Sequence, residues 1–144
     1  MAMTWGELKT QIVDLGFEED DIYDEYERII INAVNRALDV IRYKVFSQIT
    51  DYYKVTKEWG SKDPVTGEWV FPAHENVSSA TADTYTIVLP DNLVALLPLL
   101  ASHYVWLDDD ITKATLYFNE YDMFKDQILM VCKTPQKAVI EGGW

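Results

Sequence analysis

The chain has 144 residues, 49% of them hydrophobic and 25% charged, which are the length and composition of one globular domain and not of a disordered chain. Its formal net charge of −12 argues against a surface that binds nucleic-acid phosphates. No run of eighteen uncharged apolar residues occurs, and the first residues lack the basic and apolar regions of a signal peptide. We therefore expect a soluble protein made in a cytoplasm, with no membrane partner.

The first predicted element is a short helix that begins at Thr4-Trp5-Gly6-Glu7. The Thr4 hydroxyl can cap the helix, and Glu7 can reach back to the Thr4 amide. One face of this helix is predicted to carry Leu8, Ile12 and Leu15. We expect Gly16 to end the helix in the left-handed conformation, with Phe17 folding back onto it.

A long amphipathic helix is predicted from about residue 22 to 45, after the four acids at 18–21 that suit a helix start. Three-and-four spacing predicts one buried stripe, which comprises Ile22, Tyr26, Ile29, Ile30, Ala33, Val34, Ala37, Leu38, Ile41 and Val45. The opposite face is a mixed polar strip, comprising Asp24, Glu27, Arg28, Asn35, Arg36, Asp39 and Arg42. Sequence alone leaves open whether this strip is solvated or lies in a subunit interface.

Between about residues 47 and 90 the helical spacing stops, and Tyr, Val, Thr, Trp, Gly and Pro become frequent. This composition predicts a small antiparallel sheet with strands at 52–59, 68–71 and 84–89. The segment from Asp63 to Gly67 has the Pro and Gly of a tight turn and is predicted to form a hairpin tip. Residues 74–83 are interpreted as a polar loop.

Helical spacing returns after Pro90, where Asp91 or Asn92 can cap a strongly apolar helix that runs to about residue 107. Pro98 lies inside this run and is expected either to kink the helix or to make its first turn start late. Asp108–Asp110 then cap a final helix. Its predicted apolar face comprises Ile111, Ala114, Phe118, Tyr121, Phe124 or Lys125, and Ile128.

The predicted fold is therefore mainly α: an antiparallel bundle of about four helices in a single domain, residues 1–131, with a β insertion at about 47–90. The segment 132–144 contains Pro135 and two glycines and lacks a lasting period, so we expect an extended C-terminal tail that ends in an exposed Trp144.

Chemistry-bearing motifs are scarce. The chain has no glycine-rich phosphate loop, nucleophile elbow or His-Glu-x-x-His helix. His74 and His103 are expected to be surface or packed residues, and Cys132 an inert thiol. The acidic runs at 18–21 and 108–110 lack EF-hand spacing, and helix capping explains them without a metal. We therefore expect no enzyme, cofactor or metal site.

Aromatic residues around the predicted hairpin are candidate contacts with another protein: Trp59, Trp69 and Phe71. Packing onto the helices and stacking on a ligand are the alternatives. Trp144, next to two glycines, is interpreted as a docking residue, with simple disorder of the tail as the alternative.

The order of elements resembles a known family. A capped short helix and a long amphipathic helix precede a small strand region; then "Tyr85-Thr86-Ile87-Val88-Leu89-Pro90" leads into the helix with "Pro98-Leu99-Leu100-Ala101-Ser102-His103-Tyr104". The last helix opens at "Asp108-Asp109-Asp110-Ile111-Thr112-Lys113-Ala114" and contains "Phe118-Asn119-Glu120-Tyr121". This pattern, from about residue 4 to 131, is similar to the head-to-tail connector (adaptor) proteins of tailed bacteriophages.

The resemblance implies a structural virion protein whose copies form a ring, usually of twelve subunits, beneath the portal protein at the virion neck, after assembly in the host cytoplasm. DNA then passes through the ring without sequence-specific binding, and the acidity is expected to keep it from sticking. It also implies that loops and C-terminal extensions contact the portal and the next neck or tail protein (stopper or tail terminator). The candidates here are the Asp63–Gly67 hairpin and the tail from Thr134 through Pro135 to Trp144. A tail-completion or other neck protein, and an acidic DNA-mimicking inhibitor, are alternative interpretations.

Overall fold

The computed structural model describes residues 3–17, 23–45, 61–67, 69–70, 76–89 and 91–141. The described part is mainly helical, as predicted. Its longer helices are α1 (Trp5–Gly16), α2 (Tyr23–Val40), α4 (Leu97–Trp106) and α5 (Ile111–Glu141). A π-helical turn, η1 (Ile41–Val45), extends α2, and one short turn, α3 (Asp91–Val94), precedes α4.

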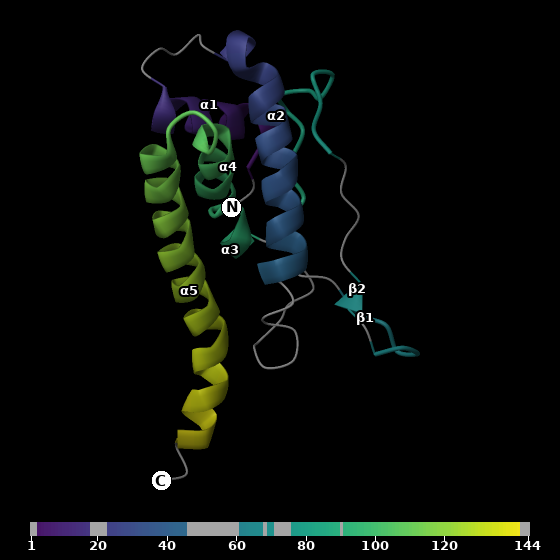
Figure 1. The fold of residues 1–144 in the computed structure, drawn as a ribbon. Coiled ribbons are helices and arrows are strands. Elements are labelled where there is room, and N and C mark those ends of the chain that lie inside the picture. The colour runs from purple at the N-terminus through teal and green to yellow at the C-terminus, as the bar shows by residue number, and fades with distance from the viewer. Residues whose placement is uncertain are drawn as a thin grey trace.

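Helix α4 is the centre of the fold, since it packs against α1, α2 and α5 (Figure 1). Its side chains Leu97, Leu100 and Ala101 have no exposed surface. Helices α2 and α5 flank it, and α1 lies across the end where α4 turns into α5 (Figure 1). The predicted late start is confirmed: α4 begins at Leu97 with Pro98 in its first turn, where the missing N–H has no helical partner to lose.

Helix α1 begins as predicted, because the Glu7 amide donates to the Thr4 hydroxyl oxygen over 3.2 Å. The Glu7 carboxylate accepts from the Thr4 hydroxyl and not, as predicted, from its amide. Leu8 and Ile12 are buried, whereas Leu15 is partly exposed, contrary to the predicted face.

The end of α1 differs from the prediction. Gly16 is the last residue of the helix and not a left-handed cap, and extended Phe17 donates its N–H to the Val13 carbonyl over 2.9 Å. A Cβ on Gly16 would lie 2.9 Å from Cε2 of Trp106, so this position needs a glycine because the indole approaches it closely. The Phe17 ring packs between Tyr26 and Trp106.

Two side chains of α5 hold the same end of α1. Lys113 donates its ammonium to the Gly16 carbonyl, and the Tyr117 hydroxyl donates to the Leu15 carbonyl. These carbonyls have no partner within α1, and a cation is favourable beside the negative end of a helix. The last helix of the chain therefore supplies the C-cap of the first.

Helix α2 has the predicted buried stripe at most positions, but Ile29 is 47% exposed. Arg42, predicted on the polar strip, is buried instead, and its Nη1 donates to the Val88 carbonyl over 3.0 Å. The π-helical turn is the physical reason, because one extra residue per turn rotates the following side chains towards the core. Burial lowers the pKa of the Arg42 guanidinium, and the neighbouring Tyr43 and Asp39 oppose this shift.

The predicted three-stranded sheet is not found in the described residues. Strands β1 (Ser61–Lys62) and β2 (Trp69–Val70) pair antiparallel, Ser61 with Val70 and Lys62 with Trp69. The segment 84–89 forms instead an isolated bridge between Thr86 and Thr4 beside α1. Backbone bonds from Trp5 to Tyr85 and from Ile87 to Met3 keep it there, so the N-terminus of the chain replaces the hairpin as its neighbour. The predicted strand 52–59 lies outside the described residues.

Helix α5 also departs from the prediction. Ala114, Tyr117, Tyr121 and Ile128 are buried, whereas Ile111, Phe118 and Phe124 are exposed to different degrees. The helix continues to Glu141, so an extended tail from residue 132 is wrong up to that point. A helix that is already formed gains a hydrogen bond with each added residue, and Pro135 removes only one donor.

Candidate functional site

The predicted contact residues of the hairpin have different outcomes. Asp63 and Gly67 build the turn: the Asp63 carboxylate accepts the Val65 amide over 2.8 Å, and the Gly67 amide donates to the Asp63 carbonyl over 2.9 Å. Gly67 has a φ of 75°, which favours glycine. Val65 at the tip is 90% exposed, and the hairpin stands away from the helices (Figure 1). Among the hairpin side chains that the structure describes, the exposed apolar group is therefore one that the sequence interpretation did not select.

Of the other predicted contact residues, one belongs to the same hairpin as this turn. Trp69 lies in β2 opposite Lys62. Pro135 lies within α5. Trp59, Phe71 and Trp144 are outside the described residues. The docking role of these five residues stays a prediction.

A surface that the sequence interpretation missed lies along α5. We call it the α5 outer stripe: Leu116, Met123 and Met130, which are 58%, 64% and 66% exposed. Seven residues separate each from the next, so they form one row along the helix. A step of two residues, about 200°, separates this row from the buried row of Ala114, Tyr121 and Ile128, so the two rows lie on opposite faces. The sequence interpretation correctly placed Ala114, Tyr121 and Ile128 on the buried face, but it did not note the second row, although its seven-residue spacing was visible.

Exposed apolar rows of this kind mark contacts between proteins more often than they mark ligand sites. Methionine is enriched at protein interfaces, and its flexible side chain adapts to a partner. Two exposed acids, Glu120 and Asp126, flank the row. The α5 outer stripe is therefore the strongest candidate for a functional surface.

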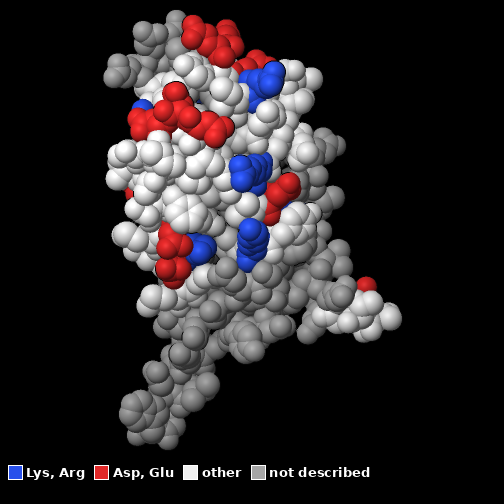
Figure 2. All heavy atoms as spheres, in the orientation of Figure 1, with Lys and Arg blue, Asp and Glu red and all other residues white. Residues whose placement is uncertain are grey.

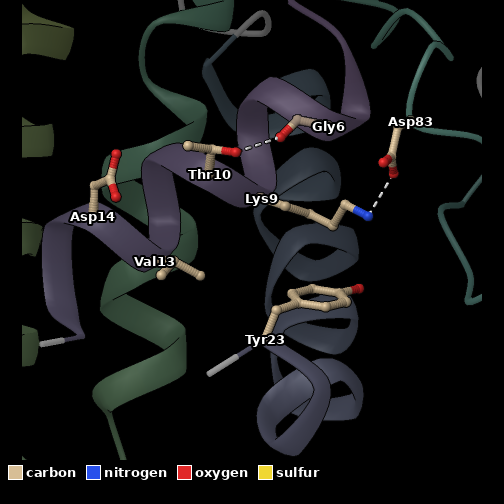
Figure 3. A pocket seen from close by; sticks show the side chains of 7 residues that line it. All are labelled: Gly6, Lys9, Thr10, Val13, Asp14, Tyr23 and Asp83. Carbon is tan, nitrogen blue, oxygen red and sulfur yellow. Dashed lines mark hydrogen bonds and ion pairs between the residues drawn. The ribbon is translucent and has the colours of Figure 1, made fainter. Parts of the chain in front are cut away.

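A hollow of about 530 Å³ lies between α1, the start of α2 and the loop at Asp83 (Figure 3). Its polar groups bind one another. Lys9 Nζ lies 2.6 Å from the Asp83 carboxylate and above the Tyr23 ring, 4.8 Å from its centroid. The Thr10 hydroxyl donates to the Gly6 carbonyl.

The polar groups of this hollow have a structural role. Burial, and then the nearby Glu27, Asp83 and Asp24, raise the pKa of Tyr23 to about 12, so its hydroxyl stays protonated at neutral pH. Lys9 forms an ion pair with Asp83. The group fixes α1 to the loop and to α2.

His103 and the acidic run at 108–110 lie within the described residues. Both supply side chains that have structural partners. His103 donates from Nδ1 to the Ala114 carbonyl over 2.8 Å and packs against Tyr104 and Phe118, so it joins α4 to α5. Asp110 accepts the Lys113 amide over 3.1 Å and caps α5, as predicted. Within the described ranges, no group of three His, Cys, Asp or Glu side chains is placed to hold a metal ion.

The acidic side chains on the face drawn in Figure 2 gather at one end of the molecule, over the start of α2 and the turn between α4 and α5. Exposed carboxylates at this end are Asp24 and Glu25 in the first turn of α2, and Asp108 and Asp109 in the turn before α5. Phe17 contacts both Tyr26 of α2 and Trp106 of α4, which places the two groups near each other. Along the helices, acids and bases alternate (Figure 2).

None of the helices in the described part of the chain is long and apolar enough to cross a bilayer. Comparison with known proteins gives no matching family model, no matching curated protein and no matching solved structure.

Proposed function

We propose that this chain is a subunit of a head-to-tail adaptor ring in the neck of a tailed bacteriophage. In this proposal it is a structural protein and not an enzyme, and it extends the DNA channel below the portal, with its copies, the portal and the next neck or tail protein as partners. The observation that carries the proposal is the α5 outer stripe, an apolar row exposed along a long helix. Exposed apolar surface of this kind is stabilised when another protein covers it.

The charge distribution supports the same function. The described acids that gather at one end of the subunit repel phosphates, which suits a ring through which DNA slides and does not suit a DNA-binding protein. Rotational symmetry places the same end of every copy on one circle. Each ring would therefore carry a closed circle of carboxylates.

The experiment that tests the proposal is native mass measurement of the purified chain, alone and mixed with the portal protein encoded in the same genome. We expect a ring, either of the chain alone or on the portal. Binding to the tail-tube protein and not to the portal would instead identify a tail-completion protein. A monomer or dimer that binds a basic host enzyme would identify an inhibitor.

The channel role has its own test. Asp108→Asn with Asp109→Asn removes two exposed carboxylates but leaves Asp110, which caps α5. We expect the ring to assemble and DNA ejection from the variant virions to slow, because less negative charge faces the phosphates. Ejection at the wild-type rate would contradict a role for these acids in DNA passage.

The end of the chain is the proposed contact with the portal or the next neck protein. Removal of Ala138–Trp144 shortens α5 and takes away Trp144, whereas the buried residues described on α5 end at Ile128. We expect weaker binding in a pull-down at unchanged stability. Unaltered binding to both partners would exclude this role.

A further inference from the structure

A second exposed row lies on α2, on the other side of α4 from α5 (Figure 1). We call it the α2 outer stripe: Ile29 and Arg36 of α2 and Tyr43 of η1, again seven residues apart in the sequence. Ile29 and Tyr43 are 47% and 55% exposed, and Arg36 is exposed between them. The α5 outer stripe spans a step of fourteen residues, or roughly 21 Å of α-helix. One molecule thus presents two exposed rows with the same spacing in the sequence.

The central residues of the two stripes are complementary. Met123, in the middle of the α5 outer stripe, has the exposed acids Glu120 and Asp126 three residues before and after it. Arg36, in the middle of the α2 outer stripe, stacks on Tyr104 with its guanidinium carbon 4.2 Å from the ring centroid, which limits its rotamers. When the stripes of two copies meet centre to centre, Arg36 lies beside Met123 and between these acids. This is true for parallel and antiparallel helices, because the centre is common to both registers.

The remaining charges favour the same pairing. The outer face of α2 carries Glu25 and Asp39 besides Arg28 and Arg36, so its formal charge is close to zero. Among the side chains of α5 that the structure describes, up to Met130, the exposed charges beside the stripe are the acids Glu120 and Asp126. Pairing two α5 faces would bring four acids together, whereas pairing α5 with α2 supplies a guanidinium to them.

We infer that the α5 outer stripe of one copy binds the α2 outer stripe of the next copy. Because the two stripes are different surfaces of one molecule, the contact is head to tail, and repeated contacts of this kind form a ring when the rotation between neighbouring copies closes. The inference rests on the proposed ring function and identifies which surfaces form its subunit interface. The apolar residues exclude water from the contact, and Arg36 with Glu120 and Asp126 sets its register.

The test uses one variant for each face. Leu116→Glu with Met123→Glu disables the α5 stripe, and Ile29→Glu with Arg36→Glu disables the α2 stripe. Sedimentation at concentrations where the wild-type chain is assembled should show each variant alone as a monomer, with association weakened at least roughly a hundredfold. An equimolar mixture should give a 1:1 dimer and nothing larger, because one intact interface remains between the two variants.

Two controls make the result specific. Ile111→Glu adds the same charge at a side chain of α5 that is 63% exposed but off the stripe, and it should leave assembly unchanged. Arg36→Glu alone should weaken assembly, and Glu120→Arg with Asp126→Arg in the same chain should restore it to within about tenfold of wild type. Circular dichroism checks that every variant is folded.

The outcomes separate this inference from the proposed function. If the α2 variant alone assembles like wild type, or the mixture stays monomeric, the α2–α5 interface is wrong although the ring may still form on other surfaces. If the wild-type chain stays monomeric both alone and on the portal, the interface and the adaptor function are both wrong.

Discussion

Gly16→Ala tests the contact between the end of α1 and the end of α4. On helix propensity alone, alanine should stabilise α1 by up to about 1 kcal/mol. The added Cβ, however, would lie 2.9 Å from Cε2 and 3.2 Å from Cζ2 of Trp106. That indole cannot move freely, since the Lys113 ammonium lies 4.0 Å from its ring centroid and the Phe17 ring centroid lies 4.9 Å away.

Displacing a packed side chain in this way costs about 1–3 kcal/mol, which outweighs the gain in propensity. We expect a net loss of about 1 kcal/mol or more, measured by urea unfolding followed by circular dichroism. All variants are compared at one protein concentration, because assembly stabilises the folded chain.

Gly6→Ala is the matched control in the same helix. Its Cβ would meet the Asp83 Cβ at 3.1 Å and the Asp83 carbonyl oxygen at 3.2 Å, so the exposed loop at Asp83 needs to move by only a few tenths of an ångström. We expect a change within about 0.5 kcal/mol of zero. The double variant Gly16→Ala with Trp106→Phe should cost less than the sum of the two single changes, because the smaller ring removes the overlap. If Gly16→Ala lowers the free energy of unfolding no more than Gly6→Ala does, the close approach of Trp106 to Gly16 is wrong.

Three further predictions concern single groups. Tyr117→Phe removes the donor to the Leu15 carbonyl and should lower the free energy of unfolding by about 1 kcal/mol; no loss in urea unfolding would contradict this cap. Asp110→Ala should cost about 1 kcal/mol and Asp110→Asn much less, because asparagine also caps a helix; equal losses would argue against capping. Burial raises the pKa of Tyr121 to about 12, and burial is also the main cause of the same rise for Tyr23. As the pH rises, the unfolded chain loses these two hydroxyl protons before the folded chain does. The free energy of unfolding should therefore fall between about pH 10 and 12. Circular dichroism across this range measures the fall, and it should be smaller in Tyr121→Phe; an unchanged profile would contradict the burial of this hydroxyl.

Local signals were sufficient for the helices and their starts. The Thr4 cap, the Asp110 cap and the late start of α4 at Pro98 each depend on residues within one turn of each other, so the sequence could predict them. The end of α1 depends on Trp106, Lys113 and Tyr117, which are far away in the chain. No local pattern around Gly16 contains that information.

The candidate surface shows a different limit. Helix α5 carries two apolar rows with the same seven-residue period. The sequence interpretation correctly placed Ala114, Tyr121 and Ile128 on the buried face, but it also placed Ile111, Phe118 and Phe124 there, and these are exposed. How much of the helix α4 covers decides which apolar residues stay exposed, and residue spacing does not contain that information. Arg42 was predicted on the polar strip because the spacing of a regular α-helix was extended to it. The π-helical turn rotates the side chains after Val40, and residue spacing does not reveal such a turn.

The acidity of the chain has two separable parts. Asp110 stabilises a helix start, and Asp24 and Glu25 lie in the first turn of α2, where carboxylates offset the positive end of the helix. These acids would be favourable in a protein that never meets DNA. Asp108 and Asp109 are exposed in the turn before α5, where Asp110 and not they accepts the capping bond from the Lys113 amide. In the proposed ring, Asp108 and Asp109 are the carboxylates whose role we assign to DNA passage. The channel test therefore changes Asp108 and Asp109 and keeps Asp110.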